Sequence, residues 1–141
     1  MKTVIFCGHS KVNEHEKVKK WIYAETEKTI LNGASEFLIG GYGDFDNLAA
    51  GVVFEMKEKY PHIKSVLVLA YPDKKTGIDS FDESVYPPLE NVPKKYAIVK
   101  RNRWMVDNSD TIIAYVLYDF GGAAKTLNYA IKEKKNVIQY K

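Results

Sequence analysis

Short apolar runs alternate with amphipathic stretches along most of the chain. Each run is continuous rather than broken by a polar residue at every second position, which is typical of parallel strands that are covered on both faces. Between the runs, apolar residues recur at the spacing of a helix. Five strands are predicted in this way, over residues 3–7, 36–39, 65–71, 111–117 and 136–140.

Local signals mark where the helices between these strands begin and end. Asn13, with Glu16 three residues later, resembles a capping box, and Gly33 is expected to end the first helix as a left-handed cap residue. Asp44 or Asp46 can cap the second helix. A third helix contains Arg101, and a fourth covers about residues 123–134.

One irregular stretch, roughly residues 72–95, interrupts the alternation. Connections of this length in compact domains are usually lids or binding loops. A long regular helix is excluded here by four prolines, Pro72, Pro87, Pro88 and Pro93.

Strands that alternate with helices predict an α/β fold with a single doubly wound, mostly parallel sheet. We expect a Rossmann-like sheet of about five strands with helices on both faces. A chain of 141 residues is long enough for one domain with a full core, so residues 1–141 are interpreted as one domain. In such sheets the ligand binds beyond the carboxyl ends of the strands, where the winding reverses.

The composition, 45% hydrophobic and 28% charged, is that of a globular protein and suggests neither disorder nor a membrane span. The apolar run at residues 4–7 is too short for a signal peptide, so a cytoplasmic protein is expected. Cys7 is the only cysteine and is interpreted as a small buried hydrophobe. The net charge of +3 is mild and its lysines are spread among glutamates, so nucleic acid is not an expected partner.

Three glycine turns, each following a predicted strand, are the first candidates for a binding site. Glycine lets the backbone approach a ligand closely, and free amides at the start of a helix favour an anion, so a phosphate-bearing ligand is predicted. No turn matches GxGxxG or GxxxxGK[ST], and the simpler interpretation is that glycines merely permit tight turns. The turns contain Gly8, His9 and Ser10, then Gly40, Gly41, Tyr42, Gly43 and Asp44, then Gly121, Gly122, Lys125 and Thr126.

Arg101 strengthens the prediction of a ligand. At about 100° per residue, Ile98, Met105 and Ser109 share one helical face, and Arg101 and Asn102 flank its centre. A guanidinium that faces the protein interior has to be paired, and an anion held at the end of the neighbouring strand is the obvious partner.

The order of these features resembles a known superfamily. Arg101, Met105, Ser109-Asp110, the following apolar strand and Gly121-Gly122 resemble the R-x-x-x-M…S/D-strand-PGGxGT pattern of the LOG phosphoribohydrolases. The segments IFCGHS and GGYGDFDNLAA resemble the wider SLOG superfamily, and PPLENVPKKYAIVKRNRWMVDNSD resembles its YpsA-like bacterial branch.

The resemblance covers nearly the whole chain and implies a Rossmann-like domain that binds a nucleotide-derived ligand, often as a homodimer. It implies that Arg101 contacts the ligand phosphate and that Gly121 and Gly122 form the phosphate loop. The chain departs from the LOG pattern where Phe120 replaces proline, Ala124 replaces the third glycine, Lys125 replaces threonine and Asn128 replaces the catalytic glutamate. An amide cannot act as a general base, so binding or sensing is favoured over hydrolysis.

Three other side chains could take over acid or base chemistry, namely Asp46, Asp119 and His9. The alternative for Asp46 is a simple helix cap, and the alternative for His9 is a hydrogen bond to loop backbone or to phosphate. Tyr42 and Tyr118 could stack on a base, or could instead pack in the core or in a dimer interface.

No metal ion or cofactor is expected. The acidic residues of the irregular stretch fit no known cation cage, and four lysines lie among them, so a solvated loop is the better interpretation. These acids are Asp73, Asp79, Asp82, Glu83 and Glu90.

The leading hypothesis from the sequence is a module that binds or senses a nucleotide-derived phosphate. Two alternatives stay open at this point. One is a phosphoribohydrolase-like enzyme that cleaves a nucleotide N-glycosidic bond with a substitute acid or base. The other is a protein-interaction module whose ligand site is vestigial.

Overall fold

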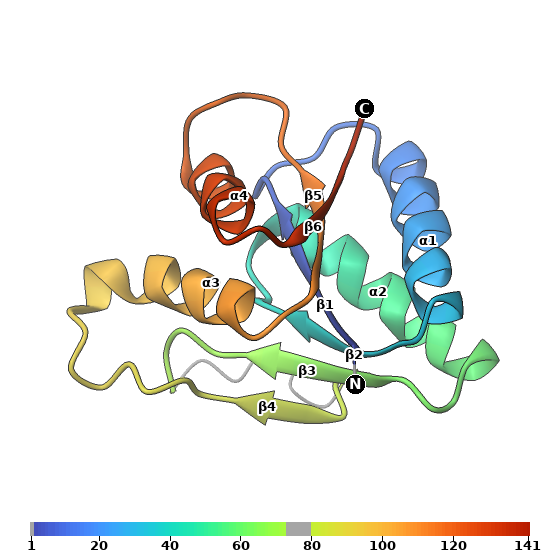
Figure 1. The fold of residues 1–141 in the computed structure, drawn as a ribbon, viewed down its shortest axis with the longest axis horizontal. Helices are drawn as coiled ribbons and strands as arrows, with labels where there is room; N and C mark the ends of the chain where they lie inside the picture. Colours follow the sequence, from blue (N-terminus) through green and yellow to red (C-terminus); the bar gives the residue numbers. More distant parts are fainter. Residues whose placement is uncertain (1, 73–79) are drawn as a thin grey trace.

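The computed structural model describes residues 2–72 and 80–141, which alternate between strands and helices (Figure 1). In chain order the elements are β1 (Lys2–Gly8), α1 (His15–Leu31), β2 (Ala34–Ile39), α2 (Gly43–Lys59), β3 (Lys64–Val68), β4 (Glu83–Val85), the 3₁₀ turn η2 (Lys94–Tyr96), α3 (Ala97–Asp107), β5 (Thr111–Tyr115), α4 (Gly122–Lys132) and β6 (Asn136–Gln139).

The six strands of the described residues form one parallel sheet in the order β4-β3-β2-β1-β5-β6. The chain winds outward from β1 to β4 and then returns through α3 to β5 on the other side of β1. At the centre, Ile5 of β1 pairs with Leu38 of β2 on one side and with Ile112 of β5 on the other. The winding therefore reverses between β1 and β5, which confirms the doubly wound fold that the sequence predicts.

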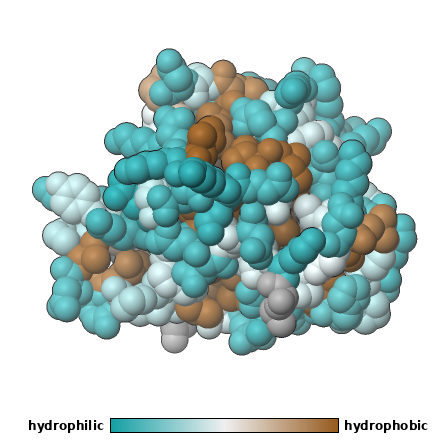
Figure 2. All heavy atoms as spheres, in the orientation of Figure 1, coloured by the Kyte–Doolittle hydropathy of each residue, from teal (hydrophilic) through white to brown (hydrophobic). Residues whose placement is uncertain are grey.

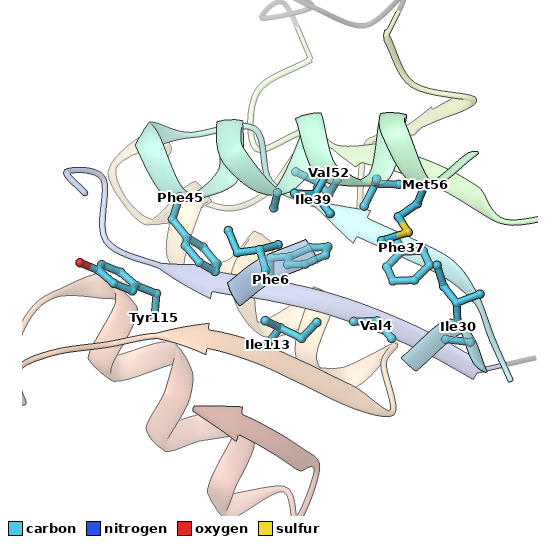
Figure 3. Packing of buried hydrophobic residues seen from close by; sticks show 14 of the residues in the cluster. Val4, Phe6, Ile30, Phe37, Ile39, Phe45, Val52, Met56, Ile113 and Tyr115 are labelled. Atoms are coloured by element: carbon cyan, nitrogen blue, oxygen red, sulfur yellow. The ribbon is translucent and has the colours of Figure 1, made fainter. Parts of the chain in front are cut away.

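Two layers of helices cover the sheet, α1 and α2 on one face and α3 and α4 on the other. The side chains of β1 alternate between the layers, because Val4 and Phe6 pack toward α1 and α2 while Ile5 packs toward α3 and α4. Figure 3 shows the first of these layers, where Phe37 and Met56 meet between β2 and α2. Burial on both sides explains why the strands are continuous apolar runs.

The outer surface is mostly hydrophilic in the orientation of Figure 2, with apolar residues reaching it in a patch at the upper centre. None of the helices within residues 2–72 and 80–141 is both long enough and apolar enough to cross a membrane.

The structure corrects the prediction in the strand count and in two helix starts. The strand that was not predicted, β4, lies in the stretch predicted to be irregular. The capping box at Asn13 is wrong, because α1 starts after Glu14, which has a φ of 54° and makes no side-chain capping bond. At the start of α2 the cap position belongs to Tyr42, so neither Asp44 nor Asp46 caps that helix. Gly33 does follow α1 with a φ of 102°, as predicted.

Candidate functional site

A cavity of about 330 Å³ lies at the carboxyl edge of the sheet, at the place where the winding reverses. Two of the three glycine turns meet there, together with the start of α2 and the inward face of α3. Its lining includes Gly8, His9, Ser10, Tyr42, Asp46, Ile98, Arg101, Asn102, Met105, Tyr118, Phe120, Gly121, Gly122, Ala123 and Thr126.

The second glycine turn, residues 40–44, opens onto a neighbouring cavity of about 450 Å³. Gly40 and Gly41 line this second cavity with the apolar side chains of Leu67 and Leu69. Of the remaining predicted residues, Gly43, Asp44, Asp119 and Lys125 are not among those that line either cavity. The two cavities share Tyr42, Ile98 and Arg101.

Arg101 stands between the two cavities with only 3% of its surface exposed, which confirms that its helix turns it inward. Its Nη1 donates to the carbonyl oxygens of Gly40 at 2.7 Å and Val68 at 2.9 Å, and its Nε donates to Oδ1 of Asn102 at 2.9 Å. Arg101 thereby ties the ends of β2 and β3 to α3. Among residues 2–72 and 80–141, its Nη2 has no hydrogen-bond acceptor and its guanidinium has no carboxylate within 4.0 Å.

Asp46 approaches Arg101 over the backbone of Gly40. A Cβ atom at Gly40 would lie 3.0 Å from Cζ of Arg101 and 3.2 Å from Oδ2 of Asp46, so this position has little room for a side chain. Burial raises the pKa of Asp46 from 3.8 to about 6, against the opposing effects of the Tyr42 N–H and the Arg101 charge. The carboxyl group is therefore a proton acceptor that titrates close to neutral pH inside the cavity.

His9 is buried at the end of β1, and its Nε2 accepts the backbone N–H of Leu117 at 2.9 Å. Because Nε2 is the acceptor, the neutral ring carries its proton on Nδ1. Burial lowers the pKa of His9 below its ordinary value of 6.5, which favours this neutral form. His9 therefore binds loop backbone, the simpler of the two interpretations offered by the sequence.

The β5–α4 turn presents the uncapped start of a helix to the cavity. Gly121 occupies the cap position with a φ of 92°, a conformation that side chains disfavour, and no side chain among the described residues caps the helix. The first backbone donor that finds an acceptor is the N–H of Lys125, which donates to the Gly121 carbonyl at 3.1 Å. In the described part of the chain, the N–H groups of Gly122, Ala123 and Ala124 have no acceptor. Free amides and the helix dipole together favour an anion at this point.

Gly43 and Asp44 act on the loops around the cavity instead of lining it. The N–H of Asp44 donates to the Ser10 carbonyl at 2.8 Å, and Oδ2 of Asp44 accepts the N–H of Val12 at 3.0 Å. Gly43 has a φ of 88°, and a Cβ atom there would lie 2.5 Å from Cα of Ser10. The second glycine turn therefore fixes the loop that carries His9 and Ser10.

Two of the acids of the irregular stretch, Asp82 and Glu83, make ion pairs. Asp82 accepts from Nζ of Lys57 at 2.6 Å and from the N–H of Ser65 at 2.8 Å, and Glu83 pairs with Lys64. Asp73 and Asp79 lie outside the described residues. Within residues 2–72 and 80–141, no three metal-binding side chains are grouped around a common point.

Sequence reasoning missed two parts of the site. In the sequence Phe120 is only a departure from the LOG pattern, and its exposed place in the lining of the cavity appears only in the structure. The second cavity is lined by Leu67, Leu69 and Ala70, which look like ordinary strand residues and carry no distinguishing signal.

A six-stranded parallel sheet with this cavity at its reversal point defines a Rossmann-like domain. A family model described as "YspA SLOG family" (YpsA) matches residues 5–141. The chain therefore belongs to the YpsA family of SLOG proteins, in agreement with the resemblance seen in the sequence.

Two curated proteins are similar over most of the chain. An uncharacterized SPbeta prophage-derived protein, YoqJ of Bacillus subtilis (strain 168), is 26% identical over 141 residues, covering 82% of this chain and 81% of YoqJ. A UPF0398 protein of Bacillus pumilus (strain SAFR-032) is 24% identical over 143 residues, covering 90% of this chain and 75% of the relative.

Solved structures share the fold at lower identity. DNA processing protein A (DprA) of Streptococcus pneumoniae superposes with a TM-score of 0.72 at 18% identity over 99% of this chain, which spans 50% of that structure's chain. DprA of Helicobacter pylori, described for its single-stranded DNA binding mode, superposes with a TM-score of 0.69 at 18% identity. The match covers 98% of this chain and 64% of the H. pylori chain. The Moco carrier protein of Chlamydomonas rheinhardtii superposes with a TM-score of 0.59 at 15% identity, and the match covers 98% of this chain and 74% of the carrier protein's chain. At these identities the similarity establishes the fold alone.

Proposed function

We propose that the protein binds a small nucleotide-derived molecule through its phosphate, in the cavity between β1, α2, α3 and α4. The observation that carries this proposal is the buried guanidinium of Arg101, which lines the same cavity as the uncapped start of α4. Its Nη2 and the amides of Gly122, Ala123 and Ala124 are donors without acceptors among the described residues. A phosphate supplies several anionic acceptors at once.

The size of the cavity favours a small molecule over a polymer. A volume of about 330 Å³ lies in the usual range for sites that take one small ligand. Proteins that bind single-stranded nucleic acid use an extended positive groove with several stacking platforms. The single-stranded DNA binding described for the H. pylori neighbour therefore serves as a competing outcome in the test of this proposal.

Isothermal titration with AMP, ADP-ribose and cyclic AMP tests the proposal directly. At least one of these should bind with a one-to-one stoichiometry, and parallel sedimentation velocity reports on the homodimer that the family resemblance implies. Absence of heat with all three at millimolar concentration would contradict the proposal. Tight, salt-dependent binding of a single-stranded oligonucleotide without binding of any mononucleotide would instead show that the protein binds nucleic acid.

A pair of variants at Gly122 isolates the contribution of one helix amide. Proline is well tolerated at the first position of a helix, so Gly122→Pro removes an N–H while keeping α4. Gly122→Ala keeps the N–H, and its methyl group would have no described heavy atom within 4 Å besides those of its chain neighbours and of the backbone of its own helix. A hydrogen bond to a charged group contributes about 1.5–3 kcal/mol, so the proline variant should bind AMP roughly 10- to 150-fold more weakly than the alanine variant. Equal affinities would show that this amide does not contact the phosphate.

A second candidate function, hydrolysis of an N-glycosidic bond, is supported by one observation. Of the substitute acids and bases suggested by the sequence, Asp46 lines the cavity with a pKa of about 6, in the range of a general base at neutral pH. Asn128, at the position of the LOG glutamate, is exposed on α4. Chromatography after incubation with AMP and ADP-ribose should show product with the wild type and none with Asp46→Asn if this function exists. If no product appears over many hours, the protein binds these nucleotides without cleaving them.

A further inference from the structure

Three aromatic rings form a continuous stack at the mouth of the cavity. The rings of His9 and Tyr118 lie nearly parallel, with centroids 4.0 Å apart and planes at 6°. The ring of Phe120 continues the stack on Tyr118, with centroids 4.4 Å apart and planes at 27°. All three residues line the cavity. Both pairs are therefore stacked ring on ring.

The inner end of the stack is fixed to the core of the protein. His9 is buried and is held by the N–H of Leu117 at 2.9 Å. Its ring also meets the buried ring of Tyr115 edge-on, with centroids 5.7 Å apart. The ring of His9 is therefore fixed, and it gives Tyr118 a rigid surface to stack on before any ligand arrives.

The outer end of the stack is open. Phe120 remains 67% exposed although one face of its ring lies on Tyr118. Among the described residues, no other ring contacts Phe120. A large apolar side chain so exposed at the rim of a cavity is a feature that calls for an explanation. Phe120 also directly precedes Gly121 and Gly122, where the free helix amides begin.

We propose that the face of Phe120 turned away from Tyr118 is the stacking platform for the base of the ligand, so that the ligand is a base-bearing phosphate and not a simple sugar phosphate. This inference rests on the proposed function, because it takes the phosphate to sit at the start of α4. The inner ring faces are already covered by one another, so the stack accepts a single base. Stacking is tolerant of base identity, so this platform favours nucleotides in general over molecules that lack a base.

The test compares AMP with ribose 5-phosphate by isothermal titration in the wild type, Phe120→Ala, Phe120→Trp and Phe54→Ala. Phe54 is a matched control, because it is 58% exposed on α2 and does not line either cavity. Removing one aromatic platform usually weakens the binding of its base about 5- to 150-fold. Wild type, Phe120→Trp and Phe54→Ala should all prefer AMP by a factor in this range, and Phe120→Ala should bind the two ligands equally. Circular dichroism confirms that each variant is folded.

Each contrary outcome identifies which idea has failed. If the wild type binds AMP and ribose 5-phosphate equally well, the platform is overturned while the proposed phosphate site stands. If Phe120→Ala weakens both ligands by the same factor, Phe120 merely shapes the turn before α4, and the platform is again overturned. If neither ligand binds to the wild type, the proposed function fails together with this inference.

Discussion

Replacing Asp46 by asparagine should stabilise the protein at neutral pH. Asp46 accepts the N–H of Tyr42 at 3.0 Å and lies close to the guanidinium of Arg101, yet burial still raises its pKa from 3.8 to about 6. Ionising this carboxyl group therefore costs more free energy in the folded state than in the unfolded state. An asparagine keeps an oxygen for the Tyr42 N–H and carries no charge.

The magnitude follows from the two pKa values. Each pKa unit corresponds to about 1.4 kcal/mol, so ionised Asp46 lowers the free energy of unfolding by about 3 kcal/mol relative to its protonated form. Well below pH 3.8 the Asp46 carboxyl group is protonated in both the folded and the unfolded state, so it does not lower the free energy of unfolding. As the pH rises toward 6, the unfolded chain loses this proton before the native protein does, so the stability falls, and the loss is complete above pH 6.

Urea unfolding of wild type and Asp46→Asn, followed by tryptophan fluorescence from pH 4.5 to pH 8, measures this effect. The other titrating groups are common to both proteins, so the difference between the two free energies of unfolding reports on Asp46. The variant should gain an advantage of up to about 3 kcal/mol as the pH rises, with most of the gain between pH 4.5 and pH 6.5. A difference that is independent of pH, or a wild type that is the more stable protein at pH 8, would show that burial does not raise the pKa of Asp46.

Three further predictions concern residues around the cavity. Gly43→Ala should lower the free energy of unfolding by at least about 2 kcal/mol, measured by urea titration, because a side chain there requires a positive φ and approaches Ser10 Cα to 2.5 Å. Burial raises the pKa of the Cys7 thiol to about 12, so iodoacetamide at pH 8 should label it only after unfolding, as mass spectrometry would show. NMR titration should place the pKa of His9 below 6.5, with the Leu117 amide signal moving at the same midpoint, and a His9 pKa above 6.5 would contradict its burial.

The fold was largely predictable from the sequence, because burial between two layers imposes one pattern on every central strand. The continuous apolar run of β1 required helices on both faces, and α1 and α3 supply them on opposite sides. The edge strand β4 was missed because it has only three residues and two of them are exposed. The start of α1 was missed because the left-handed conformation of Glu14 corresponds to no short sequence signal.

The site was only partly predictable. The helical period placed Arg101 inward, and the glycines marked the turns after the strands. The approach of Asp46 to Arg101 over Gly40 depends on three different segments, and no local pattern encodes such a contact. The stack of His9 on Tyr118 likewise joins the first loop of the chain to one near its end, so it became visible only in the fold.

The proposed function depends on a phosphate that binds at the start of α4 beside Arg101. An amide NMR titration of the wild-type protein with AMP tests it most directly, because each backbone N–H reports separately. We predict that the signals of Gly122, Ala123 and Ala124 shift together and saturate with a common dissociation constant. If AMP saturates the protein while these three amide signals do not shift, or if no amide signal shifts at millimolar AMP, the proposed phosphate site is wrong.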